Sequence, residues 1–201
     1  MILKRASAKA IRYAIKTWHY SKSVPMVQVA YAVFNDMNEW CGVICYSIGT
    51  NNNIAKPFDL AQGQVIELVR VALNGKQEST SKALAISLKL LKKDAPLVKI
   101  IVSYADTEQG HKGVIYQATN WLYLDEIKQG MDKYIVNGEA MHKKTVNSKF
   151  GTAKGFKTIK SKPKHKYIYC LDKTLLKKYK EISKPYPKAE QASEAQEKCA
   201  E

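Results

Sequence analysis

The sequence contains no long hydrophobic run. None of its apolar stretches approaches the ~20 residues that a membrane-spanning helix needs, and its first residues lack the apolar segment of a secretion signal. At 201 residues with 45% hydrophobic side chains, the chain is large and apolar enough to bury a core. We therefore expect a soluble, cytoplasmic protein without a membrane partner.

Cysteine is scarce, and its spacing indicates neither a disulfide nor a metal site. The four cysteines are Cys41, Cys45, Cys170 and Cys199. Cys41 and Cys45 fall in one expected strand, where residues four apart lie roughly 13 Å from each other, too far for a disulfide. No second pair completes a zinc site. We expect reduced thiols in the core.

Acidic residues are few compared with basic ones. The chain carries 33 basic and 18 acidic side chains, a formal net charge of +15. Residues 1–24 hold six basic and no acidic residues, and residues 142–188 hold 15 lysines against two acids. The centre, 25–141, is nearly neutral with 11 basic and 12 acidic residues. Two basic ends around a neutral centre predict a polyanionic partner. The segment 189–201, with four acids and one lysine, is expected to be a disordered acidic tail after a single domain over 1–188.

Arginine is scarcer still, because only Arg5, Arg12 and Arg70 stand against 30 lysines. Lysine suits phosphate as a point charge, whereas base edges favour the forked contacts of arginine. This composition favours nucleic acid bound largely through its backbone. The alternative is a lysine-rich composition inherited from an AT-rich genome. The lysines expected on DNA are Lys16, Lys22, Lys143, Lys144, Lys149 and Lys154.

Hydrophobic periodicity predicts alternating strands and helices. We expect strands over 27–34, 40–48, 64–73, 97–102, 121–124, 134–136 and 166–171, and helices over 7–18, 80–93, 111–121 and 146–150. Two antiparallel strands followed by alternating elements indicate an α/β fold with a mixed, mostly antiparallel sheet flanked by helices. No G-x-G-x-x-G follows a strand and no Walker motif is present, so a Rossmann fold is not expected.

One stretch, 103–124, has the features of a site. Asp106 follows a buried strand, and a turn then leads into the expected helix over 111–121. Helical spacing places Val114, Ile115, Ala118 and Trp121 on the buried side. Tyr116 is then expected to point outward, beside Gly113, which would let another group approach closely. Asn120 is expected to end the helix in a left-handed conformation.

The order of elements resembles that of the GCN5-related N-acetyltransferase (GNAT) superfamily. The resemblance implies that the strand over 65–73, the following loop and the helix from Thr80 hold the pyrophosphate of coenzyme A. A helix N-terminus is a ready anion site. The implied cofactor residues are Val71, Leu73, Ser79, Thr80, Ser81 and Lys82. The glycine-rich Q/R-x-x-G-x-G/A loop of that superfamily is missing here.

Three motifs carry a more specific resemblance over roughly residues 10–172. H-Y-S-K (19–22), E-L-V-R-V-A-L (67–73) and S-Y-A-D-x-x-x-G-H-x-G-x-I-Y-Q-A-x-N-W (103–121) are similar to those of the Mom proteins of Mu-like bacteriophages. The resemblance implies conversion of adenine in phage DNA to N6-carbamoylmethyladenine, in the cytoplasm of the bacterial host, which protects the DNA from restriction. It implies His19, Tyr20, Asp106 and Tyr116 as functional residues, acetyl-CoA as donor, and iron as a proposed cofactor.

Each candidate residue also has a structural interpretation. In the functional interpretation Tyr116 protonates a departing thiolate, and in the structural one it is a surface tyrosine. Asp106 would orient the adenine amino group, accept its proton or bind a metal, or it caps a loop. His19 and Tyr20 would contact the base, or they form a polar pair at a helix end.

Glu67 is a further candidate, either as a general base or as a carboxylate paired with Arg70. Iron could be held by His19, His111 and Asp106, two histidines and one carboxylate.

The implied substrate adds one constraint. Adenine N6 in double-stranded DNA is paired and stacked, so chemistry there requires a flipped base. Aromatic residues could help, but for Tyr167 and Tyr169 we favour core positions. Two other functions remain open: a GNAT-shaped nucleic-acid-binding protein without catalysis, suggested by the degenerate phosphate loop, and an ordinary acetyl-CoA-dependent N-acetyltransferase.

Overall fold

The computed structural model describes residues 1–48, 53–127, 133–160 and 162–188. These residues form a seven-stranded sheet in the order β1-β2-β3-β4-β5-β10-β6. The strands are β1 (Ile2–Arg5), β2 (Val29–Phe34), β3 (Trp40–Ser47), β4 (Val65–Leu73), β5 (Ile100–Asp106), β6 (Leu122–Ile127) and β10 (Lys164–Cys170). Neighbouring strands are antiparallel except β4 and β5, which are parallel. The predicted mixed, mostly antiparallel α/β sheet is confirmed.

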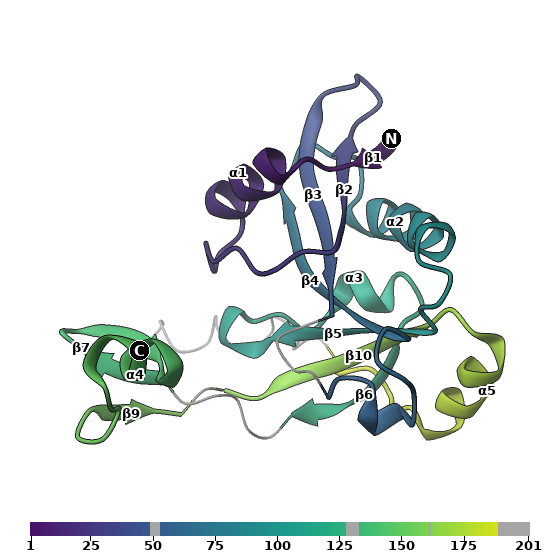
Figure 1. Cartoon of the computed structure of the whole chain (residues 1–201). Helices are drawn as coiled ribbons and strands as arrows, with labels where there is room; N and C mark the ends of the chain where they lie inside the picture. The colour runs from purple at the N-terminus through teal and green to yellow at the C-terminus, as the bar shows by residue number, and fades with distance from the viewer. Residues whose placement is uncertain (49–52, 128–132, 161, 189–201) are drawn as a thin grey trace, which may run out of the picture.

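Helices cover both faces of this sheet (Figure 1). They are α1 (Ala8–Trp18), α2 (Thr80–Asp94), the single turn α3 (Val114–Gln117) and α5 (Lys173–Ile182). Because side chains alternate along a strand, β3 serves both layers. Val43 and Cys45 pack in the cluster that contains α1, whereas Ile44 and Tyr46 pack in the cluster that contains α2 and α3. α1 and α2 therefore lie on opposite faces.

The parallel strands β4 and β5 diverge. Their pairing covers only Val65–Glu67 against Ile100–Val102, although both strands continue beyond it. In the pairing of β3 with β4, Cys45 faces Arg70 and Tyr46 faces Leu68, so Val69 is an extra residue in a β-bulge. The result is a wedge-shaped opening in the middle of the sheet, which is where the candidate site lies.

An additional small unit, hereafter the insert, occupies residues 133–159 between β6 and β10. It contains β7 (Lys133–Val136), β8 (Glu139–His142), α4 (Lys143–Phe150) and β9 (Lys157–Ile159), with a three-stranded sheet in the order β8-β7-β9. Its own buried cluster consists of Val136, Val146 and Ala153. The insert lies beyond the ends of β5, β10 and β6, to one side of the main sheet (Figure 1).

The central helix differs from its prediction. α3 is only four residues long, because Gly110 and Gly113 both have left-handed backbone conformations that prevent an earlier start. This later start changes which side is buried: Val114 is 68% exposed and Ala118 is exposed, whereas Tyr116 is 8% exposed within the core. The prediction that Tyr116 points outward was therefore wrong. Asn120 has the predicted left-handed conformation.

The group that lies close to Gly113 is a core side chain of the protein itself, the ring of Tyr167. A Cβ at this position would lie 2.4 Å from Cε2 of the Tyr167 ring. Tyr167 is fully buried, as favoured from the sequence, and its hydroxyl donates to the Lys112 carbonyl at 2.6 Å. Gly113 therefore lets β10 support the loop in front of α3.

Several elements were not predicted: β1, β8, β9 and α5. Cys41 and Cys45 are buried free thiols on β3 and Cys170 is a buried free thiol on β10, as expected. Cys199 and the expected tail 189–201 lie outside the described residues. Within the described ranges, no helix is long and apolar enough to cross a membrane.

Candidate active site

A cleft of about 570 Å³ fills the opening between β4 and β5. Its walls come from the two strands, over residues 67–71 and 103–105. Trp18, His19 and Tyr20 line it from the end of α1. Thr80 and the segment 113–116 line it from α2 and α3. Since α1 and α2 lie on opposite faces, the cleft is bounded by elements from both sides of the sheet.

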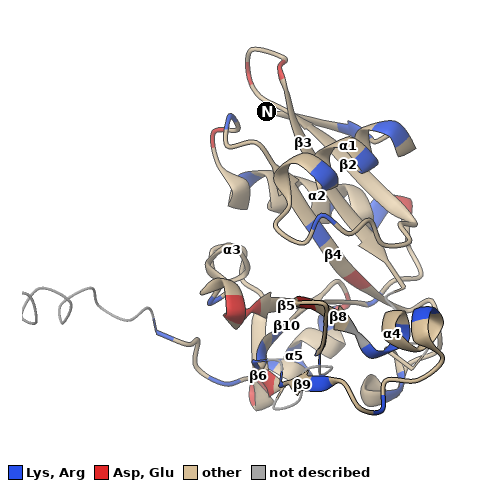
Figure 2. Ribbon diagram, turned by 90° about the vertical axis from the view of Figure 1, so that its left-hand side faces the viewer, with Lys and Arg blue, Asp and Glu red and all other residues tan. Residues whose placement is uncertain are grey.

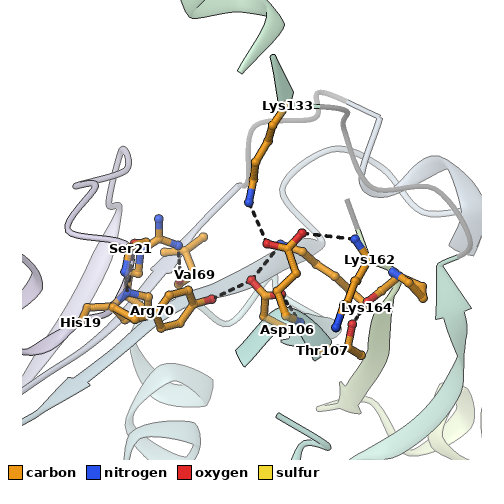
Figure 3. A network of polar contacts seen from close by, with 12 residues as sticks. His19, Ser21, Val69, Arg70, Asp106, Thr107, Lys133, Lys162 and Lys164 are labelled. Atoms are coloured by element: carbon orange, nitrogen blue, oxygen red, sulfur yellow. Dashed lines mark hydrogen bonds and ion pairs between the residues drawn. The ribbon is translucent and has the colours of Figure 1, made fainter. Parts of the chain in front are cut away.

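Tyr20 and Asp106 are joined at this cleft, although 86 positions separate them in sequence. The Tyr20 hydroxyl donates to Asp106 Oδ2 at 3.2 Å (Figure 3). Asp106 Oδ1 accepts from the backbone N–H of Glu108 at 3.1 Å and so caps the turn over 107–109. Lys164 Nζ lies 3.6 Å from Asp106 Oδ2. The two interpretations made from the sequence, loop cap and functional carboxylate, are therefore compatible, because each uses a different oxygen.

His19 supports the Tyr20 ring. The two rings stack with centroids 4.4 Å apart. His19 Nδ1 accepts from the Ser21 backbone N–H at 3.1 Å, so the ring proton of the neutral imidazole is on Nε2. Burial, the positive charge of Arg70 and the neighbouring His111 lower the pKa of His19 to about 4. At neutral pH this imidazole is therefore uncharged and offers a donor, not a base.

Arg70 holds the segment that follows α1. Its Nε and Nη2 atoms donate to the Ser23 carbonyl at 3.3 and 3.2 Å, and Nη1 donates to the Val69 carbonyl at 2.6 Å. Among the described residues no ion pair joins Arg70 to Glu67. Glu67 lines the cleft, and burial raises the pKa of its carboxyl. A raised pKa makes Glu67 a stronger base than an ordinary carboxylate.

Tyr116 reaches the cleft from the core. Its hydroxyl oxygen lies 2.9 Å from the Ser103 hydroxyl, which is also 3.1 Å from the Leu68 carbonyl. Its ring packs against Trp121 and Tyr167, with centroids 5.1 Å away in both cases. Burial raises the pKa of Tyr116 to about 12, so the phenol stays protonated at neutral pH.

The expected cofactor residues are only partly at the cleft. Val71 and Thr80 line it. Within the described residues Leu73, Ser79, Ser81 and Lys82 do not. Ser79 instead caps α2, because its hydroxyl accepts from the Lys82 backbone N–H at 3.2 Å. Because Thr80 is the first residue of α2 and lines the cleft, the positive end of the α2 dipole lies at this side of the cleft.

The candidate iron ligands do not form a metal site. Tyr20 lies among them: it stacks on His19, meets the His111 ring edge-on at 5.8 Å and donates to Asp106. No group of three His, Cys, Asp or Glu side chains that could hold a metal occurs among the described residues. The residues present therefore do not fit the iron considered from the sequence.

The predicted DNA lysines occupy two separate surfaces (Figure 2). Lys16 is exposed on α1, and Lys22 follows it, with its Nζ donating to the Thr17 carbonyl at 2.7 Å. The other four are exposed on or just after α4: Lys143, Lys144, Lys149 and Lys154.

Sequence reasoning missed the groups that connect Asp106 to the insert. Glu108 accepts from Lys133 Nζ at 2.7 Å and from the Lys162 backbone N–H at 3.2 Å, and Thr107 donates to the Pro163 carbonyl (Figure 3). Lys164 lies beside Asp106 only because the two residues are register partners in β10 and β5. Register between distant strands has no local sequence signal, so these contacts could not have been expected.

Comparisons with known proteins concern the family and the fold of this chain. A model of the Mom protein family matches residues 1–188. The methylcarbamoylase mom of Escherichia phage Mu is 28% identical over 194 residues, which cover 88% of this chain and 79% of that protein. Among solved structures, a Bacillus subtilis acetyltransferase in complex with CoA has a TM-score of 0.51 at 11% identity, over 85% of this chain and 98% of that one. Arabidopsis thaliana NAA60 in complex with acetyl-CoA has a TM-score of 0.51 at 9% identity, over 85% and 98%. The structures share the acetyltransferase fold, and the family match shows that this chain belongs to the Mom protein family.

Proposed function

We propose that this protein is a DNA-modifying transferase that uses an acyl-CoA to convert adenine in double-stranded DNA to N6-carbamoylmethyladenine. The observation that carries the proposal is the cleft between β4 and β5, where Tyr20 and Asp106 meet beside a cavity that α2 and α3 also line. Membership of the Mom family and the name of the phage Mu relative, a methylcarbamoylase, support the proposed product.

The two substrates would approach from opposite faces of the sheet. The α1 face carries the exposed cations of α1, Lys9, Arg12 and Lys16, and the exposed Tyr20 ring. The other face carries the start of α2, with Thr80 and Val71 at the cleft. DNA would therefore lie on the α1 face and the acyl-CoA on the α2 face, and their reacting groups would meet inside the opening.

The α1 side suits a flipped adenine. The Tyr20 ring is 48% exposed and rests on His19, so it offers a fixed surface on which a base can stack. The Asp106 carboxylate, at the edge of that ring, accepts hydrogen bonds and matches an exocyclic amino group. Bond formation at N6 releases a proton, and the two carboxylates available to take it are Asp106 and the half-buried Glu67.

The α2 side suits an acyl-CoA. The first backbone N–H groups of α2 and the Thr80 hydroxyl would hold the pyrophosphate. When bound, the acyl-CoA supplies the two-carbon unit. Joining its methyl carbon to N6 replaces a C–H bond with a C–N bond and so takes a two-electron oxidant as co-reactant. An amine nitrogen donor, the second co-reactant, forms the amide as the C–S bond breaks and the CoA thiolate leaves. Tyr116 can donate a hydrogen bond to the thioester group or to the sulfur as it departs. Because the pKa of Tyr116 is about 12, above the usual ~8.5 of a thiol, hydrogen bonding is favoured over complete proton transfer.

The direct test is nucleoside mass spectrometry of DNA from bacteria that express the full chain. We expect a carbamoylmethyl adduct on deoxyadenosine and protection of the DNA from endonucleases with adenine in their sites. Unmodified deoxyadenosine, in cells that contain folded wild-type protein and a competent metabolism, would contradict the proposal.

A second function, DNA binding without catalysis, is favoured by one observation. The glycine-rich phosphate loop is missing, and Ser79, a candidate to replace part of it, is used as a helix cap. Calorimetry with acetyl-CoA separates the two functions. Micromolar binding supports the enzyme, whereas DNA binding in the absence of any binding of acyl-CoA or CoA supports the second function.

A further inference from the structure

A second concavity lies along α1, next to the cleft. It has a volume of about 440 Å³, and its lining consists of Ser7, Lys9, Ala10, Tyr13, Trp18, Trp40 and Asn74. Trp18 lines both cavities, so the groove begins where the cleft ends on the α1 face. The groove runs beside α1 from Ser7 to Trp18, and the 11 residues of α1 give this helix a length of about 16 Å, at 1.5 Å per residue.

Three aromatic rings form one side of this groove. The ring centroids of Tyr13 and Trp18 are 5.6 Å apart, those of Tyr13 and Trp40 are 5.8 Å apart, and those of Trp18 and Trp40 are 5.0 Å apart. Trp18 and Trp40 pack against the buried cluster under α1, which fixes them. Tyr13 lies on top of them and is 55% exposed. The cluster is therefore a rigid, accessible aromatic surface.

The surroundings of this surface are positively charged. Lys9 lines the groove, and Arg12 and Lys16 are exposed on the same helix. Residues 1–24 contain no acid, and the described lining of the groove contains none either. Aromatic rings stack on any base, and lysine holds phosphate, so the combination matches a nucleotide. It does not match an apolar partner surface, which would avoid these cations.

We propose that the groove along α1 holds an unpaired nucleotide that flanks the target adenine, with its base stacked on Tyr13 and its phosphate beside Lys9. This assignment rests on the proposed function and deepens it, because it names a second part of the DNA that the protein grips. The groove starts at Trp18 beside the cleft and is several times longer than the ~3.4 Å step between stacked bases in one strand. Its occupant is therefore a near neighbour of the flipped base.

The acyl-CoA also contains a nucleotide, but its proposed binding side differs. The N-terminus of α2 lies on the face opposite α1, whereas the groove lies on the α1 face. DNA is therefore the occupant that the geometry favours.

The test measures binding of the full chain to duplexes with one target adenine, without acyl-CoA, so that no chemistry intervenes. One abasic sugar is placed in turn at each position around the adenine. We expect Tyr13→Ala to weaken binding to intact DNA about tenfold, within the range for loss of one stacked base. Tyr13→Phe, which keeps the ring, should bind within about twofold of wild type. At one flanking position the abasic sugar should weaken the wild type but not Tyr13→Ala.

Salt and a control variant sharpen this test. Loss of stacking releases no counterions, so Tyr13→Ala should leave the salt slope unchanged, whereas Lys9→Gln should lower it by about 0.9 on duplex DNA. Leu97→Ala, at an exposed leucine in the loop between α2 and β5, should change neither affinity nor slope.

Two results would overturn the groove assignment. The first is that every abasic position weakens DNA binding of wild type and of Tyr13→Ala alike. The second is that Tyr13→Ala binds CoA more weakly than wild type but binds DNA equally well. Thermal unfolding of Tyr13→Ala shows whether the variant remains folded, and Tyr13→Phe rescue tests the ring itself. A wild-type protein that binds no DNA would contradict the proposed function as well. Wild-type DNA binding without the shared effect would contradict only the groove.

Discussion

At the scale of single residues, Asp106 has two roles, and each role uses a different carboxylate oxygen. Oδ1 caps the turn over 107–109, and Oδ2 accepts from Tyr20. Replacement by alanine would remove the cap together with the charge, and caps of this kind stabilise by roughly 1 kcal/mol. Asparagine keeps an oxygen for the cap, while an uncharged NH2 group replaces the Oδ2 acceptor that faces Tyr20.

Asp106→Asn should therefore lower the rate of DNA modification by about 100-fold or more, the usual contribution of a positioned acid or base. Its melting temperature should stay within a few degrees of wild type. The measurement is the fraction of modified deoxyadenosine over time, with thermal unfolding in parallel. A variant that modifies DNA at the wild-type rate would leave Asp106 with only its capping role.

His19 makes a prediction about acid stability. Its pKa falls from 6.5 to about 4 on folding, so between these values the unfolded chain binds a proton that the native protein does not. The free energy of unfolding must then decrease as the pH is lowered through this window. At 1.36 kcal/mol per pKa unit, the contribution is at most about 3 kcal/mol.

Urea unfolding of wild type and His19→Gln at pH 7 and pH 4 measures this contribution. The glutamine keeps an N–H donor and cannot titrate, so its decrease in stability on acidification should be smaller than that of wild type. Equal decreases in the two proteins would mean that His19 is not the neutral group described above.

At the scale of elements, the insert is fastened to the turn that carries Asp106. Glu108, two residues after Asp106, binds Lys133 at the start of β7 and the Lys162 backbone just before β10. A partly exposed ion pair of this type adds little stability, usually below ~1 kcal/mol. Its value here would lie in fixing the position of the turn.

Glu108→Gln and Lys133→Met should each lower the modification rate several-fold and change the melting temperature little. Because both substitutions break the same ion pair, the double variant should be no slower than the slower single variant. Lys184→Met, which removes the exposed ion pair with Asp125, is the matched control and should have no effect. Additive effects in the double variant would show that Glu108 and Lys133 act separately.

The same scale shows what the sequence could predict. The left-handed conformation of Asn120 was predictable, because the preference of asparagine for this conformation is local. The buried side of α3 was not, because it depends on Gly113 and on Tyr167, a ring that arrives from 54 positions away in the chain. The short strands of the insert also lack a periodic signal, since β9 has three exposed residues.

For the site, motif resemblance grouped His19, Tyr20, Asp106 and Tyr116, and all four are at or beside one cleft. Their environments could not be predicted. The stacking of Tyr20 on His19 and the burial of Tyr116 follow from packing between elements that are distant in sequence.

At the scale of the whole molecule, the surfaces expected to bind DNA are the positively charged ones along α1 and on the insert (Figure 2), and further exposed lysines lie on α5. If both contact the DNA backbone, binding should depend strongly on salt and weakly on sequence. With about six phosphate contacts, affinity for duplex DNA should fall roughly a thousandfold between ~50 and ~200 mM salt.

Replacing Lys143, Lys144, Lys149 and Lys154 together with glutamine should lower the salt slope by up to about 0.9 for each phosphate that is no longer neutralised. These side chains are exposed, so the fold should survive. The slope is measured by fluorescence anisotropy over a salt series. An unchanged slope would place the DNA-binding surface outside the insert, and replacing Arg12 and Lys16 on α1 is the complementary experiment.

The opening between β4 and β5 has elements of both faces of the sheet around it. Under the proposed function, each substrate then has its own entrance. Spent cofactor can leave and fresh cofactor can arrive on the α2 side while the DNA stays in place on the α1 side. A protein built in this way can act processively, marking several adenines during one encounter with a long DNA molecule.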